Sequence, residues 1–247
     1  MEKIPVAVQM YTLRDAADRD FVGTLKRVAA LGYAGVELAG YGGLSASDLK
    51  ALLADLGLGI AGAHTGLDIA ETEVDALIDF HLELGNKYLV APYMSAPDAD
   101  GWRKIGQRLN VVGAKCRAYG LQVCYHNHAH EFESYDGETG LQLLFANSDA
   151  ANVQAELDLY WVTKGGQDPV QMIKKYSGRL PLLHCKDQAP DGSFAEVGNG
   201  TLDWPAIFSA APDAGVQWYI VEQDSCPGDC FDSVETSIRN LRKFGVV

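Results

Sequence analysis

The stretch FVGTLKRVAALGYAGVEL, residues 21–38, carries the unit from which we predict the whole fold. A helix is expected over residues 21–31, because apolar side chains recur there on one face at helical spacing. That face consists of Phe21, Leu25, Val28 and Ala29. Gly32 favours the end of this helix, since glycine tolerates the left-handed conformation that closes many helices. A short strand over residues 35–38 follows, so the stretch predicts a helix, a tight turn and a strand.

The same alternation of strand and helix recurs along the chain. We expect strands over residues 6–10, 35–38, 60–64, 88–91, 121–125, 153–159, 180–184 and 218–222. The expected helices cover residues 21–31, 47–56, 74–84, 102–119, 140–146, 169–176, 204–211 and 231–244. Gly57, Gly85 and Gly120 repeat the position of Gly32 at a helix end, which indicates short connections into the next strand.

The strands are short apolar runs rather than alternating patterns, which is typical of a parallel sheet covered by helices. Eight strand–helix pairs in 247 residues predict one closed (β/α)8 TIM barrel, with residues 1–247 forming a single domain. A doubly wound open sheet is the alternative. It is weakened because no strand is followed by a GxGxxG or GxxxxGK(S/T) phosphate loop. Residues 188–201 are expected to form one long loop.

Composition limits the partners and the compartment. Twenty Lys and Arg against 33 Asp and Glu give a net charge of −13, which argues against nucleic-acid and anionic-membrane partners. A hydrophobic content of 47% excludes a disordered chain, and no run approaches the roughly 20 apolar residues of a membrane helix. The first residues contain no apolar signal segment, and five cysteines fit a reducing compartment, so a cytoplasmic location is expected. Cys226 and Cys230 are expected to remain thiols.

The residues at the carboxyl ends of the strands are the candidates for chemistry, because barrel enzymes carry their active sites there. Five of the six histidines lie at these ends, and only His81 falls within a helix. Histidine and carboxylate side chains that converge from different strands provide the nitrogen and oxygen ligands of divalent ions. Because thiolates are missing from this group, manganese, cobalt, zinc, iron or magnesium is favoured over a structural zinc ion.

Four motifs carry a resemblance to a known family. They are AELDLYWVTKGGQDP (155–169), LLHCKD (182–187), AEVGNGTLDWPAI (195–207) and WYIVEQD (218–224). With these motifs the chain resembles the sugar phosphate isomerase/epimerase superfamily of xylose-isomerase-like barrels, over essentially its whole length. That superfamily includes inosose isomerases, inosose dehydratases and ketose 3-epimerases.

The resemblance implies one divalent ion, held by Glu, Asp, His and Glu at the ends of the last four strands. Position by position, Asp158, His184 and Glu222 are three of these ligands, and the first Glu falls on His126. His126 is therefore assigned as a ligand that departs from the family pattern. The dehydratase branch of the family is similarly rich in histidine on this strand.

The departure at His126 affects the implied mechanism. In the epimerases, by resemblance, the two Glu ligands also move a proton next to a carbonyl, while the metal stabilises the enediolate. A histidine in place of one Glu keeps a ligand and a base but changes its charge and basicity. His126 opposite Glu222 therefore fits a two-base epimerisation and equally fits a one-sided elimination.

Further residues at the strand ends complete the candidate site. His128 follows His126 by two residues, so both face the same way on an extended chain, and His128 is a candidate catalytic group together with His126 and Glu222. Glu156 is expected either to orient a ligand from a second layer or to replace the missing Glu ligand. Substrate binding is assigned to His64, Lys186, Trp161, Glu37 and Gln9. Each of these has a structural alternative, such as a hydrogen-bonded core side chain or a loop ion pair.

The sequence thus predicts a metal-dependent enzyme that acts on a small sugar or keto-sugar, with manganese as the first choice of ion. Isomerisation or epimerisation through an enediolate is the leading reaction. The alternative is a lyase or dehydratase acting on a 3-keto-glycoside or an inosose. An unphosphorylated substrate is favoured, because Gly198, Asn199 and Gly200 lack an adjacent basic cluster.

Two other classes of protein stay as alternatives. The same barrel family includes a DNA-repair endonuclease, but the negative charge opposes DNA binding, and Pro92 and Tyr93 end strand four where that enzyme needs further ligands. The second alternative is a non-catalytic barrel or one subunit of a hetero-complex, because the first Glu ligand is missing. A homo-oligomer is compatible with the sequence.

Overall fold

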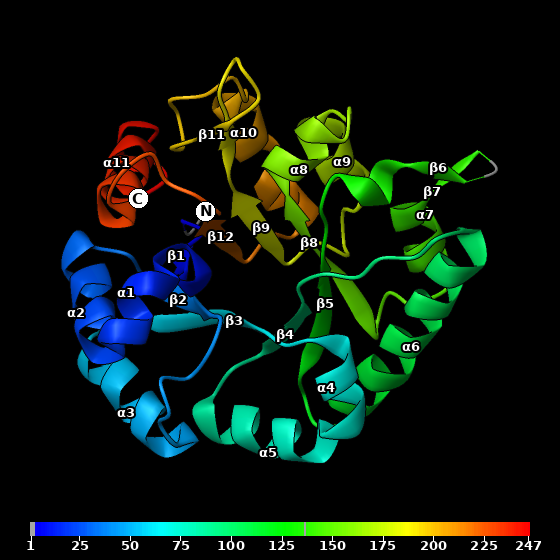
Figure 1. Cartoon of the computed structure of the whole chain (residues 1–247), viewed down its shortest axis with the longest axis horizontal. Helices are drawn as coiled ribbons and strands as arrows, with labels where there is room; N and C mark the ends of the chain where they lie inside the picture. The colour runs from blue at the N-terminus through cyan, green and yellow to red at the C-terminus, as the bar shows by residue number, and fades with distance from the viewer. Residues whose placement is uncertain (1–2, 136) are drawn as a thin grey trace.

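Eight parallel strands close into a barrel in the computed structural model, which describes residues 3–135 and 137–247 (Figure 1). The strands are β1 (Val6–Gln9), β2 (Gly35–Leu38), β3 (Gly59–His64), β4 (Tyr88–Ala91), β5 (Gln122–His126), β8 (Val153–Asp158), β9 (Leu182–Cys185) and β12 (Trp218–Val221). They follow one another around the barrel in chain order, and β12 returns to pair with β1. The predicted (β/α)8 fold is confirmed.

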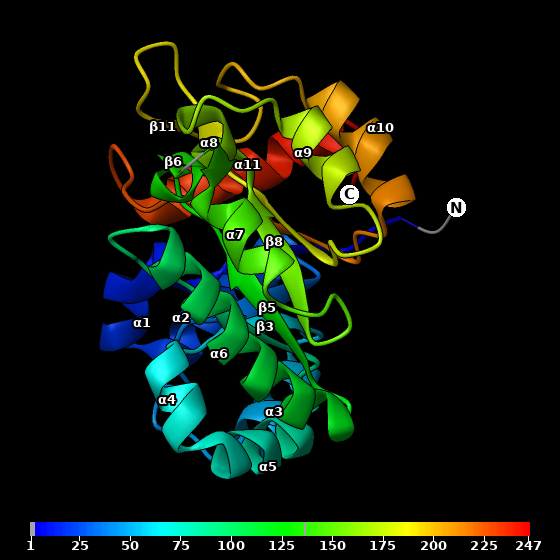
Figure 2. The ribbon, with the colours of Figure 1, turned by 90° about the vertical axis from the view of Figure 1, so that its right-hand side faces the viewer.

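Helices form a ring around this barrel, as the two views in Figure 1 and Figure 2 show. The main helices are α2 (Phe21–Leu31), α3 (Ala46–Asp55), α5 (Val74–Leu84), α6 (Ala99–Ala118), α7 (Gly140–Ala146), α9 (Pro169–Lys175), α10 (Trp204–Ala214) and α11 (Cys230–Lys243). In the unit that predicted the fold, Asp20 caps α2 by accepting a hydrogen bond from the Gly23 N–H at 2.8 Å. Gly32 ends that helix with φ of +86°.

Several local features differ from the expectation. Helix α6 begins three residues early, because the Asp98 side chain caps it by accepting a hydrogen bond from Gly101. The expected loop over residues 188–201 contains part of a hairpin, β10 (Asp187–Gln188) and β11 (Phe194–Ala195). Short elements that were not expected are η1 (Met10–Leu13), α1 (Arg14–Arg19), α4 (Leu67–Thr72), α8 (Leu159–Lys164), η2 (His130–Phe132), β6 (Ser134–Tyr135) and β7 (Glu138–Thr139).

An apolar plug fills the barrel below its carboxyl end. Its buried members are Ala7, Ala61, Tyr88, Val90, Cys124, Leu182 and Ile220. Since side chains on a strand alternate between two faces, the inward position after each plug residue lies two residues further along. Cys124 is followed in this way by His126, Leu182 by His184, and Ile220 by Glu222. The alternation therefore places a polar layer on top of the plug.

The cysteines do not all remain thiols. Cys226 and Cys230 form a disulfide with their Cα atoms 5.3 Å apart, which corrects the expectation for this pair. The loop between β12 and α11 turns back on itself and brings the two side chains together, a path that residue spacing alone does not reveal. Cys116, Cys124 and Cys185 are free and buried. Over the described residues, no helix combines the length and apolar character needed to cross a bilayer.

Candidate metal centre and active site

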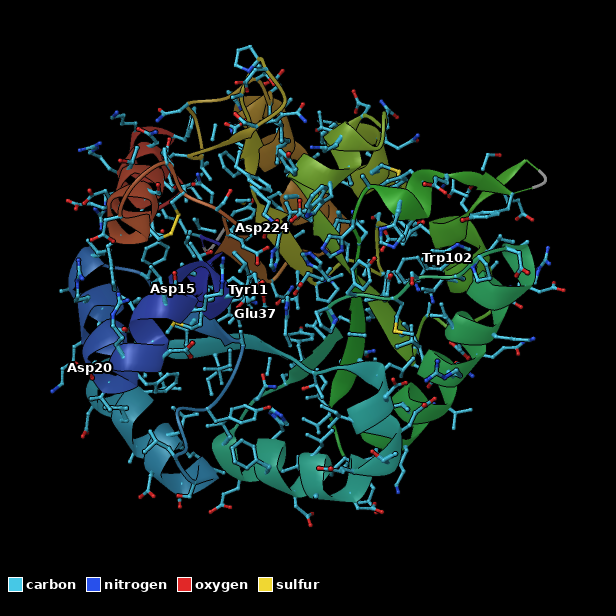
Figure 3. The ribbon with its side chains drawn as sticks, viewed as in Figure 1. Tyr11, Asp15, Asp20, Glu37, Trp102 and Asp224 are labelled. Atoms are coloured by element: carbon cyan, nitrogen blue, oxygen red, sulfur yellow. A yellow bond between two sulfur atoms is a disulfide. The ribbon has the colours of Figure 1, made fainter. Side chains whose placement is uncertain are left out.

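The candidate site lies at the carboxyl ends of the barrel strands. Figure 3 looks into this end, with Glu37, Tyr11 and Asp224 close to the barrel axis and Asp20 and Trp102 at the periphery. The floor of the site is both charged and buried. Its fully or almost fully buried members are Gln9, Glu37, His126, Glu156, Asp158, His184, Lys186 and Glu222. Burying so many ionisable groups is costly unless they are paired with one another or with an ion.

Four side chains at the top of this floor, His126, Asp158, His184 and Glu222, form what we call the outer set. Each offers one ligand atom, and these four atoms all lie within 4.8 Å of one another. His184 Nδ1 is 3.1 Å from Glu222 Oε2, and His126 Nε2 is 3.8 Å from Asp158 Oδ2. Two imidazoles and two carboxylates at this spacing suit a divalent ion that accepts mixed nitrogen and oxygen ligands.

A second group, the inner set, consists of Gln9, Glu37 and Glu156 beneath the outer set, together with His64, whose ring also reaches the cavity. Glu156 Oε1 is 2.9 Å from His126 Nδ1 and 3.0 Å from both His184 Nε2 and His64 Nε2. Glu37 Oε2 lies 2.7 Å from His184 Nε2 and accepts a hydrogen bond from Gln9 Nε2 at 2.7 Å.

Carboxylates of the inner set contact one ring nitrogen each of His126 and His184, the two histidines of the outer set. His64, His126, Glu156 and His184 also bring ligand atoms within 4.8 Å of one another, so they are a second possible ligand group. However, Glu156 Oε1 lies beside His126 Nδ1, and Glu156 Oε1 and Glu37 Oε2 lie beside His184 Nε2. The opposite nitrogens, His126 Nε2 and His184 Nδ1, therefore face Asp158 and Glu222 of the outer set. Carboxylates that orient metal-bound histidines in this way are common around protein metal sites.

The electrostatics of the floor favour a cation. Lys186 Nζ lies 3.0 Å from Asp158 Oδ2, 2.9 Å from Glu222 Oε2 and 2.9 Å from Asp224 Oδ1. Asp158 Oδ2 nevertheless accepts no hydrogen bond from the described residues. The floor thus contains four buried carboxylates, those of Glu37, Glu156, Asp158 and Glu222, and one lysine. The residues present fit a divalent ion in the outer set, because such an ion would supply positive charge beside Asp158 Oδ2, which lacks a hydrogen-bond partner among the described residues.

The pKa values of the histidines follow the same charges. Burial alone would lower the pKa of His64, but the carboxylates of Glu37 and Glu156 raise it to about 10. Burial likewise opposes protonation of His184, yet Glu156 and Glu37 raise its pKa well above the usual value. His128 behaves in the opposite way, because burial and then the neighbouring His126 and Lys186 lower its pKa to about 2. His128 is therefore a neutral ring beside charged ones.

A cavity of about 540 Å³ opens above the outer set. Its walls are formed by Tyr11, Ala39, His64, Pro92, Tyr93, His126, His128, Glu222 and Asp224. The Nδ1 atom of His128 is buried and has no hydrogen-bond partner among the residues described. The cavity therefore brings together a candidate ion site, a carboxylate and an unprotonated imidazole.

The comparisons with known proteins agree with this architecture. The chain matches the family described as "Xylose isomerase-like TIM barrel" over residues 25–244. It belongs to this family. The family expected from the four motifs is thereby confirmed.

The chain is similar in sequence or structure to several xylose isomerase-like proteins. Inosose dehydratase of Lacticaseibacillus casei is 26% identical over 147 residues, and the match covers 52% of this chain and 49% of that protein. The chain thus spans about half the length of the first relatives it matches. Inosose dehydratase of Clostridium botulinum (strain Alaska E43 / Type E3) is 24% identical over 258 residues, covering 85% of this chain and 84% of the relative. A solved sugar phosphate isomerase/epimerase from Parabacteroides distasonis ATCC 8503 is similar with a TM-score of 0.89 and 27% identity, covering 100% of this chain and 96% of that one.

Within this xylose isomerase-like barrel, the residues assigned to substrate binding lie at different depths. His64 lines the cavity, whereas Gln9 and Glu37 are fully buried beneath it. Lys186 is also fully buried, and its ammonium group contacts the three carboxylates named above rather than lining the cavity. Trp161 begins α8, where its N–H donates to Asp158 Oδ1 at 2.9 Å.

Some residues of the cavity wall were not among the predicted site residues. Tyr11, Tyr93 and Asp224 line the cavity, and Tyr11 and Tyr93 are large side chains that remain about half exposed. All three lie within two or three residues of a strand end, which is the signal that could have identified them. Their side-chain types carry no metal-ligand pattern, so only this position relative to the strand ends distinguishes them from other loop residues.

Proposed function

We propose that this chain is a divalent-metal-dependent enzyme that removes a proton from the carbon next to the carbonyl of a keto-sugar. The observation that supports it best is the buried outer set beneath a cavity into which a neutral histidine faces. A divalent ion in the outer set would supply the charge that stabilises an oxyanion developing on the substrate. His126, Asp158, His184 and Glu222 would hold this ion, and manganese is our first choice.

His128 is the proposed base. Its side chain lines the cavity, and its Nδ1 has no hydrogen-bond partner among the described residues. A candidate general base must first lie within reach of the substrate, and a residue of the cavity wall with an unengaged ring nitrogen meets that requirement. His64 is proposed to orient the substrate, since its ring lines the cavity and is held from below by Glu37 and Glu156.

Elimination is the outcome that we favour, so the chain would act as a lyase or dehydratase on an inosose or a 3-keto-glycoside. Burial alone would raise the pKa of Glu222, but Lys186 and His184 hold it well below its usual range. The Glu222 carboxylate is thus engaged by Lys186 and His184, whereas His128 Nδ1 has no hydrogen-bond partner among the described residues, which leaves His128 to act from one side. The proton moves from the carbon next to the carbonyl to His128, and the electron pair of the broken C–H bond forms a carbon–carbon double bond. The C–O bond on the next carbon breaks, and its oxygen takes up the proton that His128 then releases and departs as water or an alcohol. The names of the inosose dehydratase relatives support this choice.

Isomerisation or epimerisation is the second candidate. Glu222 and His128 come from β12 and β5, which lie far apart around the barrel, and both line the same cavity. Two groups that reach a substrate from different sides are what a two-base proton transfer needs. The name of the solved Parabacteroides protein supports this alternative.

Deuterium exchange tests the step that both outcomes share. The manganese-loaded protein is incubated in D₂O with 2-keto-myo-inositol or with 3-keto-glucose, and NMR follows deuterium next to the carbonyl and the loss of substrate. We expect H128Q to slow both by about 10²- to 10⁴-fold, as loss of a general base does, with the manganese content unchanged.

H130Q is the matched control. His130 Nε2 bonds the Met94 carbonyl at 2.7 Å, and its side chain does not line the cavity, so H130Q should react at the parent rate. An H128Q rate equal to that of H130Q would remove His128 from the mechanism. No exchange and no product with either sugar in the parent protein would overturn the proposed function.

A further inference from the structure

A second cavity of about 350 Å³ adjoins the one above the outer set. The two share Tyr11 and Ala39 in their walls, so they meet at the side chain of Tyr11. The other walls of the second cavity are formed by Met10, Arg14, Ala17, Asp18, Phe21, Gly40 and Gly42. These residues belong to η1, α1, the first position of α2 and the loop after β2, so the second cavity lies at the same carboxyl end of the barrel.

The opposite rim of the barrel is covered by aromatic side chains. After β8, the ring of Tyr160 packs against Phe194 with centroids 4.3 Å apart, and Trp161 lies 5.8 Å from Phe194. Trp161 also covers His128, with ring centroids 5.2 Å apart. In the strand order, β8 lies across the barrel from β2. A further cavity of about 430 Å³ lies beside Tyr160 and Phe194, but it shares no wall residue with the cavity above the outer set. The shared walls therefore favour the β1 and β2 side for a substrate larger than one ring.

The second cavity has the mixture of surfaces that sugar rings bind. Tyr11 is about half exposed, and the Arg14 guanidinium stacks on its ring at 4.3 Å from the centroid. Arg14 donates to the carbonyls of Tyr11 at 2.8 Å and Asp224 at 3.0 Å, which leaves further N–H groups of its five for a ligand. Aromatic faces contact the C–H side of a sugar, and charged planar groups bond its hydroxyls.

Two further residues shape this cavity and its charge. Gly42 adopts φ of +60° and leaves no room for a Cβ against the ring of Phe21, so the loop lies close to that apolar wall. The exposed carboxylate of Asp18 faces the same space as Arg14. This pairing of charges suits neutral hydroxyls, which use both donors and acceptors, better than an anionic group such as phosphate.

We propose that the second cavity is a subsite for a sugar ring linked to the reacting keto-sugar. The substrate is then a keto-glycoside with two rings rather than a free keto-sugar or an inosose. This inference rests on the proposed function for the identity of the first ring. To the proposed function it adds the size of the substrate, two rings, and the position of the second ring, which extends past Tyr11 into the second cavity.

Two probes that differ only by the second ring test the proposal. They are methyl 3-keto-β-D-glucoside and 3-keto-cellobiose, the latter oxidised on its non-reducing ring, and both carry the same type of linkage. Calorimetry on the manganese-loaded protein gives the affinity for each, and deuterium exchange in D₂O gives kcat/KM. We expect the two-ring probe to be favoured by about tenfold in both, the effect of one added aromatic contact.

Two neighbouring alanines of α1 provide the matched variants. Ala17 lines the second cavity, whereas Ala16 lines a third one that shares Arg14 with the second and Asp224 with the first, and both alanines are half-buried. A17L should abolish the preference for the two-ring probe by filling the subsite, while A16L should preserve it. D18A, at an exposed position, removes a polar wall without a packing change and should reduce the preference by severalfold.

The outcomes separate the two proposals. Equal affinity for both probes in the parent protein, or the same preference in A17L as in A16L, would overturn the subsite. Two-ring affinity without any exchange or consumption would support the subsite and count against the proposed function. Exchange with equal kcat/KM for both probes would support the function and overturn the subsite.

Discussion

The outer and inner sets are built on the same barrel, one layer apart, yet their side chains are satisfied in different ways. In the inner set, Gln9 bonds Glu37, and one oxygen each of Glu37 and Glu156 carries every contact to the rings. In the outer set, Asp158 and Glu222 share the single ammonium group of Lys186. Glu37 Oε1, Glu156 Oε2 and Asp158 Oδ2 all lack a hydrogen-bond partner among the described residues. The difference between the layers is therefore one of contacts, because the lower layer contacts and orients the histidine rings, while the upper layer holds two carboxylates that share one lysine.

The largest effect is expected from removing one charge of the outer set. D158N keeps the size of the side chain and a cap for α8, since asparagine also caps helices. It removes a metal ligand charge, and a bound ion contributes several kcal/mol to such reactions, so activity should fall by about 10³-fold or more. Elemental analysis should show that the manganese of the parent protein is lost.

D168N is the matched control for this variant. Asp168 caps α9 as Asp158 caps α8, by accepting a hydrogen bond from Gln171 N–H at 2.7 Å, but it lies outside the site. D168N should therefore keep its metal and its activity. If D158N retained the ion with parent affinity, the outer set would not be the metal site.

A smaller effect is expected from the inner set. E156Q keeps the shape of the side chain but removes the charge that orients the rings of His126 and His184. Loss of such an orienting carboxylate usually weakens metal affinity by about 10- to 100-fold. Titration of the metal-free protein with manganese, followed by calorimetry, measures this change.

The size of the E156Q effect also decides between the two roles that the sequence left open for Glu156. A loss as complete as that of D158N would make Glu156 a ligand that replaces the missing family Glu. An unchanged affinity would show that the inner set orients nothing. E83Q, which neutralises an exposed carboxylate of α5, controls for the change in net charge and should bind manganese as the parent does.

Features that follow from the alternation of side chains along a strand were predictable from the sequence. Features that depend on the course of a loop were not. His126, His184 and Glu222 each lie two residues beyond an apolar plug residue, so their inward direction and common level were predictable. The paths of the loops after β1 and β12 were not, because few local patterns determine them. For this reason the wall formed by Tyr11 and the disulfide of Cys226 were missed.

His81 lies outside the site and can be compared with the buried histidines of the inner and outer sets. The effect expected from changing it, on stability rather than on activity, is the smallest. This ring on α5 is fully buried like those of the site, but it has no carboxylate beside it in the described structure. Tyr41 Oη lies 3.0 Å from its Nε2, and Asn86 Nδ2 donates to its Nδ1 at 3.1 Å. Burial lowers the pKa of His81 to about 4, whereas the carboxylates of the inner set raise that of His64 to about 10.

The sign of the pH effect follows from this lowered pKa. The unfolded chain binds a proton at His81 near pH 6.5 and the folded chain only near pH 4, so His81 favours the folded state above pH 6.5 and loses that contribution as the pH falls. Between pH 7.5 and pH 5 the free energy of unfolding should drop by about 2 kcal/mol through this residue. Urea unfolding of the parent and of H81Q at both pH values measures it, because the contributions of all other groups cancel in the difference between the two proteins.

An equal pH dependence in the parent and H81Q would mean that folded His81 accepts a proton as readily as an exposed histidine. Asn86 could allow this only by turning its oxygen toward the ring. That rotation would break the bond from Asn86 Nδ2 to the Tyr88 carbonyl at 2.8 Å and the one from the Tyr88 N–H to Asn86 Oδ1 at 3.3 Å. The two bonds to Tyr88 therefore hold the amide in the orientation that keeps His81 neutral. The same kind of ring is charged or neutral in this protein according to which group its neighbour presents, a carboxylate oxygen or an amide N–H.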